Sequence, residues 1–141
     1  MKVIIVGGVA GGASCAARLR RLDEKVEIIM VEKGPYVSYT NCGLPYHISG
    51  VISRESSLLV ANEQVFKVVH NIGVRTGCEA VAIDPGKKTV DLRDVATGKL
   101  TTESYDKLVL SPGATSIRPP LPGIDLPGIF QVRTVPDART I

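Results

Sequence analysis

The residues best suited to chemistry lie in segment 36–50, where one cysteine stands among polar side chains. Cys42 follows Ser38 and Asn41, and the short run from Leu44 onward is expected to form a helical turn. The dipole of a helix N-terminus favours a thiolate, so a cysteine placed there can act as a nucleophile at neutral pH. A buried structural cysteine is an equal alternative on spacing alone.

A glycine-rich stretch near the start of the chain has the pattern of a dinucleotide-binding turn. It follows an apolar, β-branched run at 2–6, which is typical of a strand covered on both faces, and it precedes a helical segment. Free N–H groups at such a helix N-terminus attract a pyrophosphate. Glu32 ends a second strand about twenty residues after the last glycine, where an acid can bind a ribose. The stretch consists of Gly7, Gly8, Val9, Ala10, Gly11 and Gly12.

These features together predict an adenine dinucleotide site. Val9 departs from the pattern G-x-G-x-x-G, because it occupies the middle glycine position. The competing interpretation is a tight turn between strand and helix that binds no ligand. It requires the strand, the helix and the terminal acid to coincide by chance.

The helix after the glycine stretch carries two stripes at the spacing i, i+4, i+7. Ser14, Arg18 and Arg21 form a polar and basic stripe, which is either a solvated face or a clamp for substrate phosphates. The other stripe is apolar and is predicted to face the core; it consists of Cys15, Leu19 and Leu22.

Further along, the pattern predicts a helix, a meander and a return to the first sheet. Asn62 is a candidate cap for a helix whose Val65, Phe66 and Val69 face inward. Turn sequences divide 79–104 into an antiparallel three-stranded meander, which is inserted into a parallel sheet that also contains 74–76 and 105–110. A strand at 129–132 and a helical turn at 136–141 complete the expectation. The predicted fold class is α/β, a Rossmann-like domain with this insertion.

Composition sets broad limits on function. The chain has 141 residues and is 44% hydrophobic, which is enough for one core. Seventeen basic and 14 acidic residues leave a net charge of +3, too mild to argue for nucleic acid or a membrane surface as partner. Three cysteines at irregular spacing do not form a disulfide framework, so we expect a reducing, cytoplasmic location.

Two runs together carry a resemblance to a known family. The glycine stretch and the run from Ser38 to Tyr46, which reads Ser-Tyr-Thr-Asn-Cys-Gly-Leu-Pro-Tyr, resemble the FAD-dependent pyridine nucleotide-disulfide oxidoreductases of the single-cysteine type. Coenzyme A-disulfide reductases and NADH-dependent persulfide reductases are the members most similar to it. Valine replaces the middle glycine in that family too, and the resemblance covers the whole chain.

The resemblance implies roles for individual residues. Cys42 would be the redox nucleophile beside the flavin, with Asn41 and Ser38 next to it. The substrate would be a small thiol or disulfide of the coenzyme A type, contacted by Ser14, Arg18, Arg21 and His70. NAD(P)H would supply electrons through FAD. The residues that would bind FAD are Gly7 to Gly12, Glu32, Lys33, Val81, Ser111 and Gly113.

The cysteine spacing independently favours the single-cysteine class, because Cys78 is the next cysteine after Cys42. Electrons leaving the flavin would therefore pass to an external sulfur or oxygen. The main hypothesis is reduction of coenzyme A disulfide or a persulfide. The alternatives are an NADH oxidase or peroxidase that cycles through a cysteine sulfenic acid, and a nucleotide-binding module in which Cys42 is structural.

The resemblance also implies that residues 1–141 are the N-terminal part of an FAD-binding domain. The NAD(P)H-binding and dimerisation domains would lie outside it, since no second glycine fingerprint occurs here. We expect the full-length protein to be a homodimer and the isolated stretch not to turn over NADH.

Overall fold

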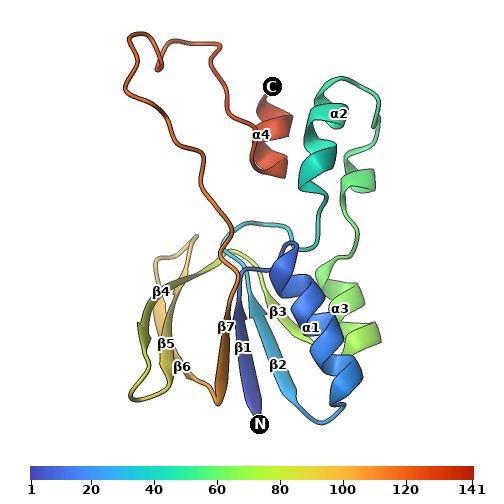
Figure 1. Ribbon diagram of the computed structural model, residues 1–141, viewed down its shortest axis with the longest axis vertical. Helices are drawn as coiled ribbons and strands as arrows, with labels where there is room; N and C mark the ends of the chain where they lie inside the picture. The colour runs from blue at the N-terminus through green and yellow to red at the C-terminus, as the bar shows by residue number, and fades with distance from the viewer. The chain divides into compact units, whose positions relative to one another are not determined.

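The computed structural model describes all 141 residues, which form two compact units. The first unit comprises Met1–Tyr39 and Ala61–Pro112, and the second comprises Thr40–Val60 and Gly113–Ile141. Figure 1 shows the elements of each unit. The structure contains no helix with the length and apolar character needed to cross a bilayer.

A four-stranded parallel sheet is the centre of the first unit. Its strand order is β3-β2-β1-β7, with β1 at Lys2–Val6, β2 at Glu27–Val31, β3 at Gly73–Arg75 and β7 at Lys107–Leu110. The central residues of β1 are fully buried because both faces of the sheet are covered. The predicted parallel sheet is confirmed.

The two faces of this sheet carry different layers. Helices α1 (Gly11–Leu22) and α3 (Glu63–His70) pack on one face, where Ile5, Met30 and Phe66 meet in one core cluster. The other face receives Val90 and Leu92 from the meander. The meander is antiparallel, as predicted, and consists of β4 (Cys78–Asp84), β5 (Thr89–Asp94) and β6 (Leu100–Ser104).

The predicted inward faces of the two helices are confirmed only in part. On α1 Cys15 and Leu19 pack against the core cluster as predicted, beside the buried Ala13 and Ala16, whereas Leu22 is 66% exposed. Six residues after Ala16, Leu22 is turned about 120° away from it. On α3 Phe66 is buried in the core cluster as predicted, while Val65 and Val69 are exposed, because the face of the helix that points inward is the one centred on Phe66. Asn62 caps this helix as predicted.

The second unit is built from short helices. They are η1 (Asn41–Gly43), α2 (Leu44–Ile48), η2 (Glu55–Leu58) and α4 (Val135–Thr140). Their buried side chains are Leu44, Leu58, Val135 and Ala138.

The C-terminal part of the second unit confirms one prediction and corrects another. The helix expected at 136–141 forms one residue earlier, with a capping box between Thr134 and Asp137. The strand predicted at 129–132 is absent, because no neighbouring strand pairs with this segment and its apolar side chains remain exposed.

Candidate functional site

The glycine turn between β1 and α1 is fixed by close backbone packing. Gly7 has a φ of 92° and its N–H donates to the carbonyl of Val31, extending the β1–β2 ladder. A Cβ atom on Gly12 would lie 1.7 Å from the carbonyl oxygen of Gly7, and one on Gly7 would lie 1.9 Å from that of Ser111. Only glycine fits at positions 7 and 12, and Ser111 packs directly against the turn.

Val9 fits this turn without strain. Gly7 is the one residue of the turn with a positive φ, so the valine at the middle position adopts an ordinary backbone conformation. The departure from the usual pattern is therefore compatible with the fold of the turn.

The N-terminus of α1 offers free hydrogen-bond donors. An α-helix begins with N–H groups that lack helical partners, and its dipole places partial positive charge at this end. The N-cap residue Ala10 provides no side-chain cap, and the first turn contains no acidic residue. Ala10 and Gly11 are exposed at this end of the helix. These donors suit the two phosphates of a dinucleotide.

Glu32 ties the end of β2 to the glycine turn. Its Oε2 accepts a hydrogen bond from the Gly8 N–H at 2.7 Å, and its Oε1 accepts one from the Gly34 N–H at 2.8 Å. A carboxylate oxygen has a second lone pair, so this half-buried group can still accept hydrogen bonds from ribose hydroxyls. The structure thus brings the predicted acid and the predicted turn together.

Lys33 is held toward the meander by an ion-pair network that the sequence did not reveal. Its Nζ lies 2.9 Å from Glu79 Oε1, and Arg93 binds the other oxygen of the same carboxylate. Hydrogen bonds from Lys33 and Arg93 hold the pKa of Glu79 below its usual value. Val81, two residues along β4, sits in a β-bulge, which leaves its backbone outside the regular ladder.

The basic stripe of α1 is available to a ligand. Ser14, Arg18 and Arg21 are all exposed, and neither arginine takes part in an ion pair. His70 lies at the C-terminal end of α3, and its carbonyl accepts a hydrogen bond from Arg20 in the last turn of α1. His70 is therefore near the C-terminal end of α1, where Arg21 lies. This is the end of the parallel strands away from the glycine turn.

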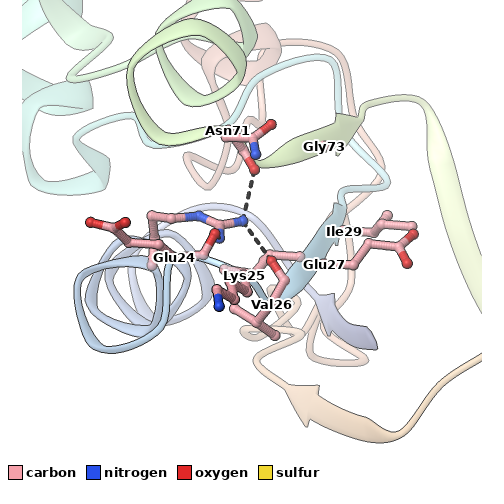
Figure 2. A pocket seen from close by; sticks show the side chains of 9 residues that line it. Glu24, Lys25, Val26, Glu27, Ile29, Asn71 and Gly73 are labelled. Atoms are coloured by element: carbon pink, nitrogen blue, oxygen red, sulfur yellow. Dashed lines mark hydrogen bonds between the residues drawn. The ribbon is translucent and has the colours of Figure 1, made fainter. Parts of the chain in front are cut away.

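Arg20 is structural, although it lies between two candidate ligand-binding arginines. Its guanidinium donates to five backbone carbonyls, those of His70, Asp23, Glu24, Val26 and Asn71. Figure 2 shows the bonds to Val26 and Asn71 beside a cavity of about 360 Å³. All five N–H donors of the side chain are used internally, so this cavity gains no anion-binding group from Arg20.

Cys42 lies in the second unit, in the 3-10 turn η1, and its side chain is exposed. Asn41 is half-buried, and Leu44, which begins α2 as predicted, is buried. The neighbour that sequence reasoning missed is Thr40, whose Oγ1 lies 3.2 Å from Cys42 Sγ. The available signal was a threonine in the N-cap position of a turn.

The other predicted residues are divided between the two units. Ser38 belongs to the first unit, has a φ of 48°, and donates its N–H to the Gly8 carbonyl at 2.9 Å, so it packs on the glycine turn. Gly113 belongs to the second unit and has a φ of 74°.

The three cysteines differ in environment. All are free thiols, and Cys42 is the exposed one. Cys15 packs against the core of the first unit, and burial raises the pKa of Cys78. Neither resembles a reactive thiol, and no cluster of side chains could hold a metal ion.

A parallel sheet, a tight glycine turn, an uncapped helix N-terminus and an acid at the end of β2 define a Rossmann-like dinucleotide-binding fold. The family model for pyridine nucleotide-disulphide oxidoreductases matches residues 1–141. The chain therefore belongs to this family of FAD-dependent flavoproteins that use NAD(P)H.

Individual relatives narrow the comparison. A coenzyme A disulfide reductase of Staphylococcus haemolyticus is 41% identical over 140 residues, which are 99% of this chain and 31% of that protein. The solved structure of reduced Bacillus anthracis CoADR-RHD is 49% identical, with a TM-score of 0.95, over 99% of this chain and 25% of that one. An NAD-dependent persulfide reductase from A. fulgidus is 36% identical, with a TM-score of 0.92, over 99% of this chain and 26% of that one. This chain thus spans about a third or less of each relative's length.

Proposed function

We propose that this chain forms the N-terminal part of the FAD-binding domain of an NAD(P)H-dependent reductase for small-molecule disulfides or persulfides, such as coenzyme A disulfide. The observation that carries the proposal is the single exposed thiol, Cys42, in a chain that also has an uncapped dinucleotide turn. Relatives with the printed names coenzyme A disulfide reductase and persulfide reductase support it.

The groups proposed to bind FAD are mainly backbone groups. The turn Gly7–Gly12 and the first N–H groups of α1 would take the pyrophosphate, and Glu32 would take the adenosine ribose. Lys33, the Val81 backbone, Ser111 and Gly113 would complete the site. The flavin would supply two-electron transfer between NAD(P)H and a sulfur.

The role proposed for Cys42 is that of the nucleophile. Its thiolate attacks one sulfur of the substrate disulfide, forms a mixed disulfide and releases the first thiolate. Two electrons that originate from NAD(P)H then break the mixed disulfide, release the second thiolate and restore the thiolate of Cys42. The net change is one NAD(P)H and one proton consumed for two thiols formed. Asn41 and Ser38 would position the reacting sulfurs.

The substrate clamp would be the stripe of Ser14, Arg18 and Arg21, together with His70. Its exposed and unpaired arginines support an anionic substrate, because each guanidinium can bind a phosphate through two N–H groups. Coenzyme A carries such phosphates.

An oxidase is the second candidate. The water-forming NADH oxidase from Lactobacillus brevis is 28% identical, with a TM-score of 0.91, over 99% of this chain. In that case Cys42 would cycle through a sulfenic acid, and the basic stripe would be only a solvated face. The third interpretation, a structural Cys42, conflicts with the exposure of the side chain.

The complete protein is proposed to contain NAD(P)H-binding and dimerisation domains after residue 141 and to act as a cytoplasmic homodimer. The small share of each relative that this chain spans supports the further domains, while the homodimer and the cytoplasmic location follow from the family resemblance alone. Residues 1–141 alone would then lack the nicotinamide site and would not oxidise NADH.

The decisive experiment compares the complete flavin-loaded protein with its Cys42→Ser and Cys78→Ser variants. We expect NADH-dependent reduction of coenzyme A disulfide to fall by at least about a thousandfold in Cys42→Ser, with FAD still bound, because no thiolate remains to attack. Cys78→Ser, which alters a half-buried thiol, should stay within about twofold. Full activity of Cys42→Ser would refute the proposal, and consumption of oxygen without disulfide reduction would favour the oxidase.

A further inference from the structure

Thr40 contacts Cys42 through its hydroxyl group. Thr40 Oγ1 lies 3.2 Å from Cys42 Sγ, and the same oxygen accepts a hydrogen bond from the Gly43 N–H at 3.2 Å. A hydroxyl has one hydrogen and two lone pairs. Because the oxygen already accepts from Gly43, its own hydrogen is free to point at the sulfur, and the two bonds polarise each other in series.

The backbone of the second unit fixes the position of this hydroxyl. The Thr40 N–H donates to the Leu58 carbonyl at 2.8 Å, and the side chain of Leu58 is completely buried. A Cβ atom on Gly43 would lie 2.7 Å from Thr40 Cγ2, so the glycine leaves the space that the threonine side chain occupies. Thr40 is therefore held on both its main-chain and its side-chain atoms.

The helix after Cys42 is a weak source of thiolate stabilisation. Helix α2 has only five residues, Leu44–Ile48, so few peptide dipoles add up at its N-terminus. The sequence pattern assigned the activation of Cys42 to this helix. The structure instead sets the hydroxyl of Thr40 against the sulfur.

We propose that Thr40 is a positioning residue that donates a hydrogen bond to the thiolate of Cys42. The inference rests on the proposed function, and it names the group that prepares the nucleophile. The bond orients the Cys42 sulfur and stabilises the negative charge that it carries as a thiolate. It also stabilises the same sulfur as the leaving group when the mixed disulfide is reduced, since a better-stabilised thiolate leaves faster.

The test follows alkylation of Cys42 by iodoacetamide against pH in the complete flavin-loaded protein, with Cys42 identified by peptide mass spectrometry. Thr40→Val keeps the branched shape and removes the hydroxyl, and Thr40→Ser keeps the hydroxyl. At pH 6 we expect alkylation of the valine variant to be about fivefold slower than in the wild type, as the loss of one ordinary hydrogen bond predicts. Its pH profile should move to higher pH, and the serine variant should stay within about twofold of the wild type.

A role for Thr40 only as the cap of η1 would give a different result. Loss of the cap lowers the melting temperature in Thr40→Val but leaves the pH profile of alkylation in place. A valine profile that coincides with the wild type therefore overturns the proposal. Thr40→Ala provides a second hydroxyl-free variant should Thr40→Val fold poorly, and the same criterion applies to it.

These measurements separate the two proposals. If Cys42→Ser keeps its disulfide reductase activity, the proposed function fails, while the alkylation profiles still decide whether Thr40 interacts with the thiolate. If Cys42→Ser is inactive and the Thr40 profiles are unchanged, the function stands and the role of Thr40 falls.

Discussion

The glycine turn before α1 and the cysteine turn before α2 are both tight turns that lead into a helix, yet different groups fix their shapes. In the first, backbone packs on backbone, and a Cβ atom on Gly12 would meet the Gly7 carbonyl at 1.7 Å. In the second, the side chain of Thr40 caps the turn and also contacts the sulfur. A site for a ligand that never changes can be formed by backbone groups. A site that adjusts the reactivity of one atom needs side chains, because side chains can be exchanged without changing the fold of the turn.

The surroundings of the two turns also differ, because the glycine turn adjoins a buried sheet and the cysteine turn adjoins short helices. The glycine turn continues two buried parallel strands through the hydrogen bonds from Gly7 to Val31 and from Ser111 to Val6. The cysteine turn rests on short helices with a few buried residues, chiefly Leu44 and Leu58. We therefore expect the first turn to be rigid and intolerant of change, and the second to open locally at lower free energy.

The largest expected effect comes from Gly12→Ala. The added methyl group cannot avoid the Gly7 oxygen unless the turn opens, so we expect a loss of about 3 kcal/mol or more of stability and no retained FAD. Flavin absorbance and thermal unfolding of the purified protein measure both. Gly73→Ala is the matched control, because Gly73 lacks a positive φ and its Cβ would make an ordinary contact at 3.5 Å. Normal flavin content in Gly12→Ala would contradict the backbone origin of the site.

An intermediate effect is expected from Leu58→Ala, which removes a side chain with no exposed surface from beneath the cysteine turn. The cavity costs about 2–4 kcal/mol. Hydrogen exchange should accelerate in residues 40–60 and stay unchanged in β1. Val51→Ala, at a position that is 76% exposed, should leave both rates unchanged. Equal acceleration in β1 and in residues 40–60 would show that the two turns share one cooperative unit.

The sequence predicted the glycine turn well, because backbone packing fixes it. It predicted the cysteine turn poorly, because side-chain contacts fix it. The spacing of the glycines and of Glu32 follows from a local strand-turn-helix unit, so it could be read directly. Arg20 could not be assigned, because two of its carbonyl partners, those of His70 and Asn71, lie about fifty residues away. The contact of Thr40 with Cys42 depends on how η1 winds, and the residue types alone do not specify it.

The same limit explains the errors elsewhere. Val69 fits an inward stripe by spacing, but the packing of Phe66 in the core cluster sets the rotation of α3 and leaves Val69 exposed. Residues 129–132 have strand-like composition, but a strand also needs a pairing partner. The pairing of Lys33 with Glu79 joins the bend after β2 to β4 and follows only from their arrangement in space.

The smallest expected effect tests whether ion pairs between side chains contribute to the stability of the first unit, which contains the glycine turn. Glu103 on β6 lies 2.6 Å from Lys2 Nζ and 2.8 Å from Arg75 Nη1, and hydrogen bonds from these two groups lower its pKa in the folded protein. A lowered folded-state pKa adds stability at pH values above the unfolded pKa, and this stability is lost as the pH falls through the folded value. Glu103→Gln should therefore cost about 1 kcal/mol at pH 7.

The difference between Glu103→Gln and the wild type should shrink as the pH falls below the ordinary glutamate value of 4.5, because the wild-type carboxylate then becomes protonated. Urea unfolding at pH 7 and at progressively lower pH measures it. Glu24→Gln, an exposed position whose side chain makes no ion pair, is the control and should differ little from the wild type at any pH. A penalty in Glu103→Gln that stays constant with pH would mean that packing, and not charge, joins the meander to the parallel sheet at this point.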